Sequence, residues 1–90
     1  MKLEEKILID YASRAELIDN LGHRIGELED TLEAMDNNIE EADHCGLDEV
    51  VEILCENRNK LNLTLLELKL QYNKLEKEQL EFERIQLLSK

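Results

Sequence analysis

A chain of 90 residues with no proline, three glycines and 37% charged residues has room for one domain and the composition of a protein built from long helices. Its 22 acidic and 11 basic residues give a net charge of −11, which argues against direct binding to nucleic acid or to an anionic membrane. The sequence has neither a run of 18 apolar residues nor a basic leader followed by an apolar core, so we expect a cytoplasmic protein.

The first helix is expected over residues 2–44, where apolar residues recur at alternating intervals of three and four. The uninterrupted series comprises Ile18, Leu21, Ile25, Leu28, Leu32, Met35, Ile39 and Ala42. This spacing is the a/d seam of a coiled coil, and a seam of this kind needs a partner helix to shield it from water. Upstream, residues 3–17 broaden the apolar face on both flanks, with Leu8, Ala12 and Ala15 among the added positions.

Two glycines four residues apart, Gly22 and Gly26, interrupt the first helix. Each glycine costs a helix about 1 kcal/mol relative to alanine, so a kink or a break is expected here if anywhere. Because the interval pattern passes through this stretch without a shift of phase, we favour a continuous helix. The alternative is a three-helix chain that breaks near Gly22 and folds back on itself.

The turn is predicted at residues 44–48. Gly46 suits the left-handed position just past the end of a helix, and Leu47 can make the apolar contact that accompanies it. Asp48 suits the N-cap of the next helix, and Glu49 lies in its first turn, where negative charge is favourable. A connection this short joins antiparallel neighbours.

The second helix is expected over residues 49–88, with a seam of its own. This seam comprises Val51, Leu54, Arg58, Leu61, Leu65, Leu68, Tyr72, Leu75, Gln79 and Phe82. If residues whose numbers add up to 93 face each other, every layer pairs an a position with a d position, and Arg14 meets Gln79 with Glu78 alongside. One register fits the whole chain, which favours an intramolecular antiparallel hairpin over a parallel homodimer. Within the seam we expect Arg58 to reach Glu33, Glu56 or the flank of Met35.

The second helix also carries leucines on the side opposite its seam, namely Leu63, Leu66, Leu70, Leu80 and Leu87. An exposed apolar patch of this size is unusual for a soluble monomer. We therefore expect two hairpins to pack there against residues 3–17, giving a four-helix homodimer, with a higher homo-oligomer as the next possibility. The expected oligomer or client face comprises Leu8, Ala12, Ala15, Leu63, Leu66, Leu70 and Leu80.

Acidic residues are concentrated in the middle of the chain. Between Glu16 and Asn57 there are 14 acids and one base, Arg24. The acids at the end of the first helix oppose its dipole, which suggests that negative potential itself is needed. The candidate partner-binding residues at this acidic turn end are Glu33, Asp36, Glu40, Glu41, Asp43, Asp48, Glu49 and Glu52. A solvated coiled-coil exterior that happens to be acidic is the alternative interpretation.

No enzyme signature is present: the chain lacks a glycine-rich phosphate loop, HExxH, CxxC and a serine in a strained turn. His44 and Cys45 lie beside Asp43 and Asp48, but the spacing fits neither a zinc site nor a calcium loop, so no metal or cofactor is expected. Cys45 and Cys55 are about 15 Å apart if helical, too far for a disulfide.

These observations predict an all-α antiparallel helical hairpin that acts by protein interaction without catalysis. The expected function is that of an adaptor or inhibitor whose acidic end docks on a basic surface of a protein partner, which could be a nucleic-acid-binding site addressed by charge mimicry. The alternative is a structural or assembly component, a small scaffold or chaperone that grips a client helix through its leucines. No residue pattern points to a known family.

Overall fold

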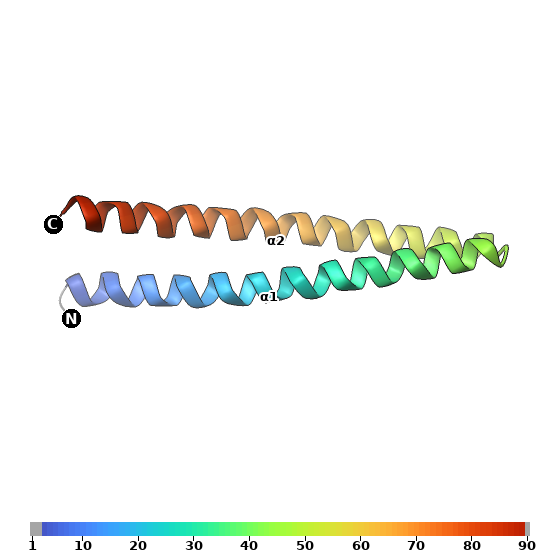
Figure 1. The fold of residues 1–90 in the computed structure, drawn as a ribbon, viewed down its shortest axis with the longest axis horizontal. Coiled ribbons are helices and arrows are strands. Elements are labelled where there is room, and N and C mark those ends of the chain that lie inside the picture. Colours follow the sequence, from blue (N-terminus) through green and yellow to red (C-terminus); the bar gives the residue numbers. More distant parts are fainter. Residues whose placement is uncertain (1–2, 90) are drawn as a thin grey trace.

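The computed structural model describes residues 3–89, with side chains from residue 10 onward, and consists of two long helices joined by a tight turn. Helix α1 comprises Leu3–His44, and helix α2 comprises Asp48–Leu88. The helices are antiparallel, so both termini lie at one end and the turn lies at the other (Figure 1). The molecule measures 65 × 24 × 15 Å. The predicted all-α helical hairpin is confirmed.

Helix α1 is continuous through both of its glycines, so the three-helix alternative is wrong. The backbone at Gly22 and Gly26 is helical, and the positive φ among the described glycines belongs to Gly46. At Gly22 the lost side chain is partly replaced by a neighbour from the other helix, because an added Cβ would lie 3.6 Å from Tyr72 Cε2. The seam on either side of the glycines holds the helix against α2, which explains why it does not break there.

The core is the seam between the two helices and is thin. Among the described side chains, only Leu32, Ala42, Leu65 and Gln79 are more than nine-tenths buried, and the other seam residues are half-buried. The rings of Tyr11 and Phe82 lie with centroids 5.0 Å apart, and Arg14 hydrogen-bonds to Gln79. Both pairs add up to 93, so the predicted register is confirmed.

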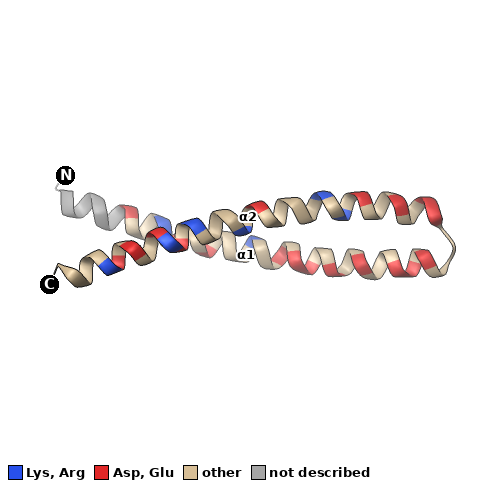
Figure 2. Cartoon of the chain, turned by 90° about the horizontal axis from the view of Figure 1, so that it is seen from above, with Lys and Arg blue, Asp and Glu red and all other residues tan. Residues whose placement is uncertain are grey.

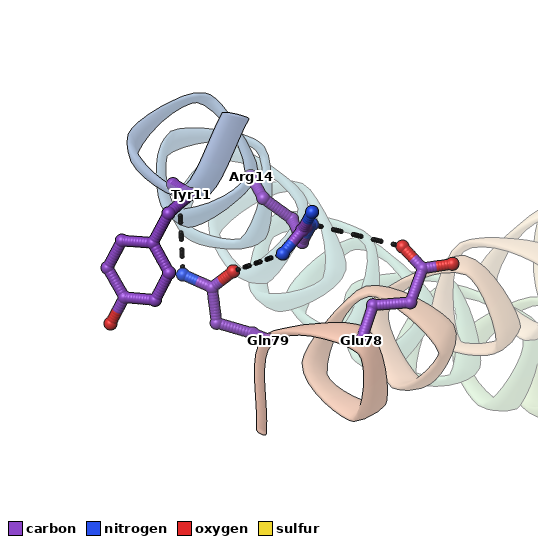
Figure 3. A network of polar contacts seen from close by, with 4 residues as sticks. All are labelled: Tyr11, Arg14, Glu78 and Gln79. Carbon is purple, nitrogen blue, oxygen red and sulfur yellow. Dashed lines mark hydrogen bonds and ion pairs between the residues drawn. The ribbon is translucent and has the colours of Figure 1, made fainter. Parts of the chain in front are cut away.

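A polar layer crosses the seam near the open end (Figure 3). Arg14 Nη1 donates to Gln79 Oε1 at 3.1 Å, and Gln79 Nε2 donates to the Tyr11 carbonyl oxygen at 3.2 Å. Arg14 Nε also lies 3.9 Å from Glu78 Oε2, as the register predicted. A slip of one heptad would place Gln79 opposite an apolar seam residue and strand its amide, so this layer specifies the register.

The turn closes α1 with a Schellman motif. Gly46 has φ 71°, its N–H donates to the Asp43 carbonyl at 3.0 Å, and the Leu47 N–H donates to the Ala42 carbonyl at 3.0 Å. The prediction that Asp48 is the N-cap of α2 is wrong. Leu47 occupies that position without a side-chain cap, because its carbonyl accepts the first helical bond from Val51 N–H, and Asp48 is the first helical residue.

Replacing Gly46 with alanine tests the turn. A side chain at positive φ costs about 1–2 kcal/mol, so we expect Gly46→Ala to lower the free energy of unfolding by that amount. Gly46→Asn should lose less, because asparagine tolerates the left-handed region better. Urea denaturation at a fixed protein concentration measures both variants. Equal losses would mean that backbone conformation is not what position 46 requires.

A double-mutant cycle tests the polar layer. Gln79→Leu removes the acceptor of a half-buried guanidinium, and we expect it to lower the free energy of unfolding by about 1–3 kcal/mol. Adding Arg14→Leu removes the stranded donor as well and should restore most of the loss. Urea denaturation of the two single variants and the double variant gives the coupling energy, and additive effects would show that the pair is not coupled.

Candidate functional site

The acidic residues gather on the turn half of the hairpin, which comprises residues 27–66 (Figure 2). This half carries twelve acidic residues against two basic ones, Arg58 and Lys60, and therefore a net charge of −10 out of −11 for the whole chain. The remainder of the hairpin is almost balanced. Folding thus turns an uneven sequence into a molecule with one strongly negative half.

The structure moves the boundary of this acidic region relative to the sequence. Glu16 and Asp19 belong to the acidic stretch of the sequence, but the register places them level with Lys77 and Lys74 on α2. Four further acidic residues share the turn half and were not among the predicted site residues: Glu27, Glu29, Asp30 and Glu56. All four were among the 14 acids counted between Glu16 and Asn57, but they were left out of the predicted site because that set was limited to residues near the turn.

All eight predicted partner-binding residues are exposed. Of the twelve acids of the turn half, two pair with a basic residue within the part of the chain that the structure describes: Asp36 with Arg58, and Glu29 with Lys69 at 4.0 Å. The other ten point their charge at solvent without a basic neighbour in this part. Such a surface carries a negative potential that the protein does not itself neutralise.

Arg58 occupies a seam position, and its partner differs from the prediction. Its Nε and Nη2 donate to the two carboxylate oxygens of Asp36, the second bond being 3.3 Å long. Neither Glu33 nor Glu56 is the partner, because Asp36 lies on the edge of α1 beside the half-buried guanidinium. The hydrogen bond with Asp36 raises the pKa of Arg58, which keeps the charge in place. This contact occupies one of the predicted partner-binding carboxylates.

The leucine face of α2, which comprises Leu63, Leu66, Leu70, Leu80 and Leu87, is uncovered. The first three side chains are 59%, 51% and 69% exposed, and Leu80 and Leu87 are similarly open. On α1, Ala12 is exposed and Ala15 is half-buried, whereas the side chain of Leu8 lies outside the described residues. The hairpin therefore has an apolar outer surface that neither of its own helices covers.

A hollow lies along α1 at its two glycines, and we call it the glycine groove. It has a volume of about 680 Å³, and its lining includes Gly22, Gly26 and Tyr72 together with the acidic residues Asp19, Glu27 and Asp30. A second hollow of about 330 Å³ continues it toward the open end, past Ala15 and Leu80. The sequence predicted a possible kink at Gly22 and Gly26 and did not predict this groove.

The hollows described above are open to solvent, and the free thiols and acidic groups of the described residues lie apart from one another. No group of three or more metal-ligating side chains occurs among them. Cys45 is exposed, Cys55 is half-buried, and both are free thiols. Within the described part of the chain, neither helix has a stretch apolar enough to cross a membrane.

One titratable contact at the open end provides a probe of the fold. Tyr11 donates its hydroxyl to Glu83 Oε1 at 2.9 Å, and this hydrogen bond to a carboxylate raises the pKa of Tyr11. Tyr72 is shifted in the same direction, because its hydroxyl lies beside Glu76. Since the folded-state pKa of Tyr11 lies above its unfolded value, the stability from this contact is present below pH 10 and is lost as the phenol ionises.

Tyrosine absorbance measures this shift. In a Tyr72→Phe background, we expect the phenol of Tyr11 to ionise with a midpoint above 10.0. Adding Glu83→Gln removes the carboxylate and should move the midpoint down toward that value. Glu81→Gln is the matched control, because Glu81 pairs with Arg84 and should leave the midpoint unchanged. If the midpoint is the same with and without Glu83→Gln, the side chains of Tyr11 and Glu83 are not in contact in solution.

Comparisons of the chain with protein-family models, with curated proteins and with solved structures give no match.

Proposed function

We propose that this protein is a non-enzymatic interaction module whose acidic turn half docks on a basic surface of another macromolecule, as an adaptor or inhibitor. One observation carries the proposal: ten of the eleven net negative charges lie on one half of a rod-shaped molecule. A field of one sign attracts an oppositely charged surface and accelerates encounter with it. The exposed and unpaired state of most of these carboxylates supports the same conclusion.

The charge density suggests what kind of basic surface would fit. The turn half spans about 20 residues of each helix, or about 30 Å, and so carries about one net negative charge per 3 Å. Duplex DNA carries one per about 1.7 Å of axis, and each of its strands carries one per about 3.4 Å. A groove built to hold the phosphates of a nucleic acid is therefore a plausible class of target, addressed by mimicry.

A second candidate function rests on the leucine face. A scaffold or chaperone could grip the apolar side of a client helix through Leu63, Leu66 and Leu70, which the hairpin leaves open. Salt separates the two functions. Docking through carboxylates should weaken as ionic strength rises, whereas docking through leucines should persist.

The test uses a variant with three carboxylates of the turn half neutralised, Glu33→Gln/Glu40→Gln/Glu41→Gln. These residues are exposed and have no ion pair among the described side chains, so the fold should not change. We expect a basic partner that is captured at about 50 mM salt to bind the variant at least about 10-fold more weakly than it binds the unmodified protein. We also expect the partner to dissociate from the unmodified protein above about 500 mM salt.

The matched control is Asp10→Asn/Glu16→Gln/Glu67→Gln. It changes the net charge by the same amount as the test variant, but at residues outside the acidic turn half. Asp10 and Glu16 lie in the open half and Glu67 lies just beyond the turn half, and all three are exposed. The control should bind like the unmodified protein. If both variants bind alike, or if the captured partner survives high salt, the acidic turn half is not the docking surface.

A further inference from the structure

We propose that the glycine groove on α1 receives the leucine face of a second copy of this chain, so that two hairpins form a parallel, two-fold symmetric dimer. In this dimer Leu66 and Leu70 of each copy enter the groove of the other at Gly26 and Gly22. The groove and Leu66 lie at the border of the acidic turn half, whereas the carboxylates tested for docking, Glu33, Glu40 and Glu41, lie nearer the turn. The two proposals can therefore succeed or fail independently.

Packing within a single hairpin does not explain why the groove is lined by glycines. Gly26 is helical, and nothing lies within 4 Å of the position where a Cβ would stand. Neither the backbone nor packing inside the chain requires glycine there, although glycine costs a helix about 1 kcal/mol relative to alanine. Gly22 meets only an ordinary contact distance of 3.6 Å to the Tyr72 ring. Open space at a residue that destabilises its own helix indicates a partner that approaches closely.

The leucines stand at the right height to be that partner. In the register of the hairpin, Gly26 faces Glu67 and Gly22 faces Gln71, so Leu66 and Leu70 lie within about 1.5 Å of the glycines along the axis. Both pairs are also spaced by four residues, or about 6 Å. A two-fold axis parallel to the hairpin keeps every level and places α2 of one copy on α1 of the other. Each knob then meets a hole, twice by symmetry.

At the level of the groove, the facing segments of the two copies carry opposite charge. Residues 16–35 of α1 carry six acids and one base, a net charge of −5, whereas residues 58–77 of α2, at the same level, carry five bases and two acids, a net charge of +3. The two-fold operation brings the negative segment of one copy against the positive segment of the other. In particular, Asp19, which lines the groove, comes level with Lys74 of the leucine-bearing helix. The dimer thus satisfies apolar and ionic groups together.

The hairpin exposes more surface than a compact chain of its mass. The hairpin exposes 7255 Å², whereas a compact monomer of 10.6 kDa exposes roughly 5,500 Å². The surplus is roughly 1,800 Å², and each partner of a standard interface buries about 800 Å². A second copy would cover the groove and the leucines and leave residues 36–57 around the turn free. A parallel dimer also brings the two acidic turn halves to the same end, where like charges repel, so its stability depends on the groove and the leucines.

Sedimentation equilibrium of two single variants tests the contact. Gly26→Leu fills the hole and Leu66→Ala removes the knob, and each should raise the dimer dissociation constant by about 30-fold or more. Circular dichroism should show unchanged helix content in both. The matched controls are Ala34→Leu and Ile53→Ala, which make similar changes at exposed positions elsewhere on the two helices and should leave the dimer intact.

Mixing the variants distinguishes a specific contact from damage to the fold. In a heterodimer of Gly26→Leu and Leu66→Ala, one site keeps leucine on glycine and the other pairs the new leucine with the new alanine. We expect the mixture to dimerise although neither variant does so alone, and the chain carrying both changes to dimerise by itself. A mixture that stays monomeric overturns the knob-and-hole contact.

The orientation has its own measurement, because Cys45 lies in the turn and is exposed. With Cys55→Ala and a spin label on Cys45, a parallel dimer should give a label separation below about 30 Å. An antiparallel dimer would place the labels at opposite ends of a rod 65 Å long and overturns the proposal. So does a chain that remains monomeric at about 1 mM, a result that would leave the leucines to a client helix.

Discussion

The seam between α1 and α2 is the constraint on which the rest of the molecule depends. It is narrow, because an interval pattern of three and four buries one stripe per helix, and few of its described residues are fully shielded. Length compensates for this thinness, since the seam is repeated along both helices. The cost of a purely apolar seam is that neighbouring registers resemble one another. The Arg14–Gln79 layer removes that ambiguity, because in a slipped register its hydrogen bonds have no partners.

The antiparallel seam also decides how charge is distributed in space. A stretch of acids that ends α1 and another that begins α2 are separated by a turn of three residues, so they come to lie side by side. The lysines later in α2 return to the level of Glu16 and Asp19, so the net charge at that level is small. The acidic half is thus a product of the fold and of the sequence together. A parallel arrangement of the same helices would have mixed these charges.

Much of the fold could be predicted because local and long-range signals agree. The seam, the left-handed glycine at position 46 and the register all follow from residue spacing. Three features were wrong or missed, each because spacing does not report direction. The partner of Arg58 depends on which carboxylate lies at the edge of the seam. The N-terminus of α2 has no side-chain cap, and this depends on the direction in which the chain leaves the Schellman motif. The glycine groove exists because no side chain of the hairpin fills the space beside Gly26, and residue spacing does not report empty space.

The leucine face follows from the same geometry. Helix α2 is apolar on two opposite sides, and a hairpin with a single partner helix can cover only one of them. Within the described chain, α1 covers the seam and leaves the outer leucines exposed, which is why we propose a second copy as their partner. In the proposed dimer, the glycine groove supplies the complementary surface at the same level of the chain. A chain that carries a knob and the hole that fits it at the same level is complementary to a second copy related by a two-fold rotation. For such a surface, the simplest partner is another copy of the same chain.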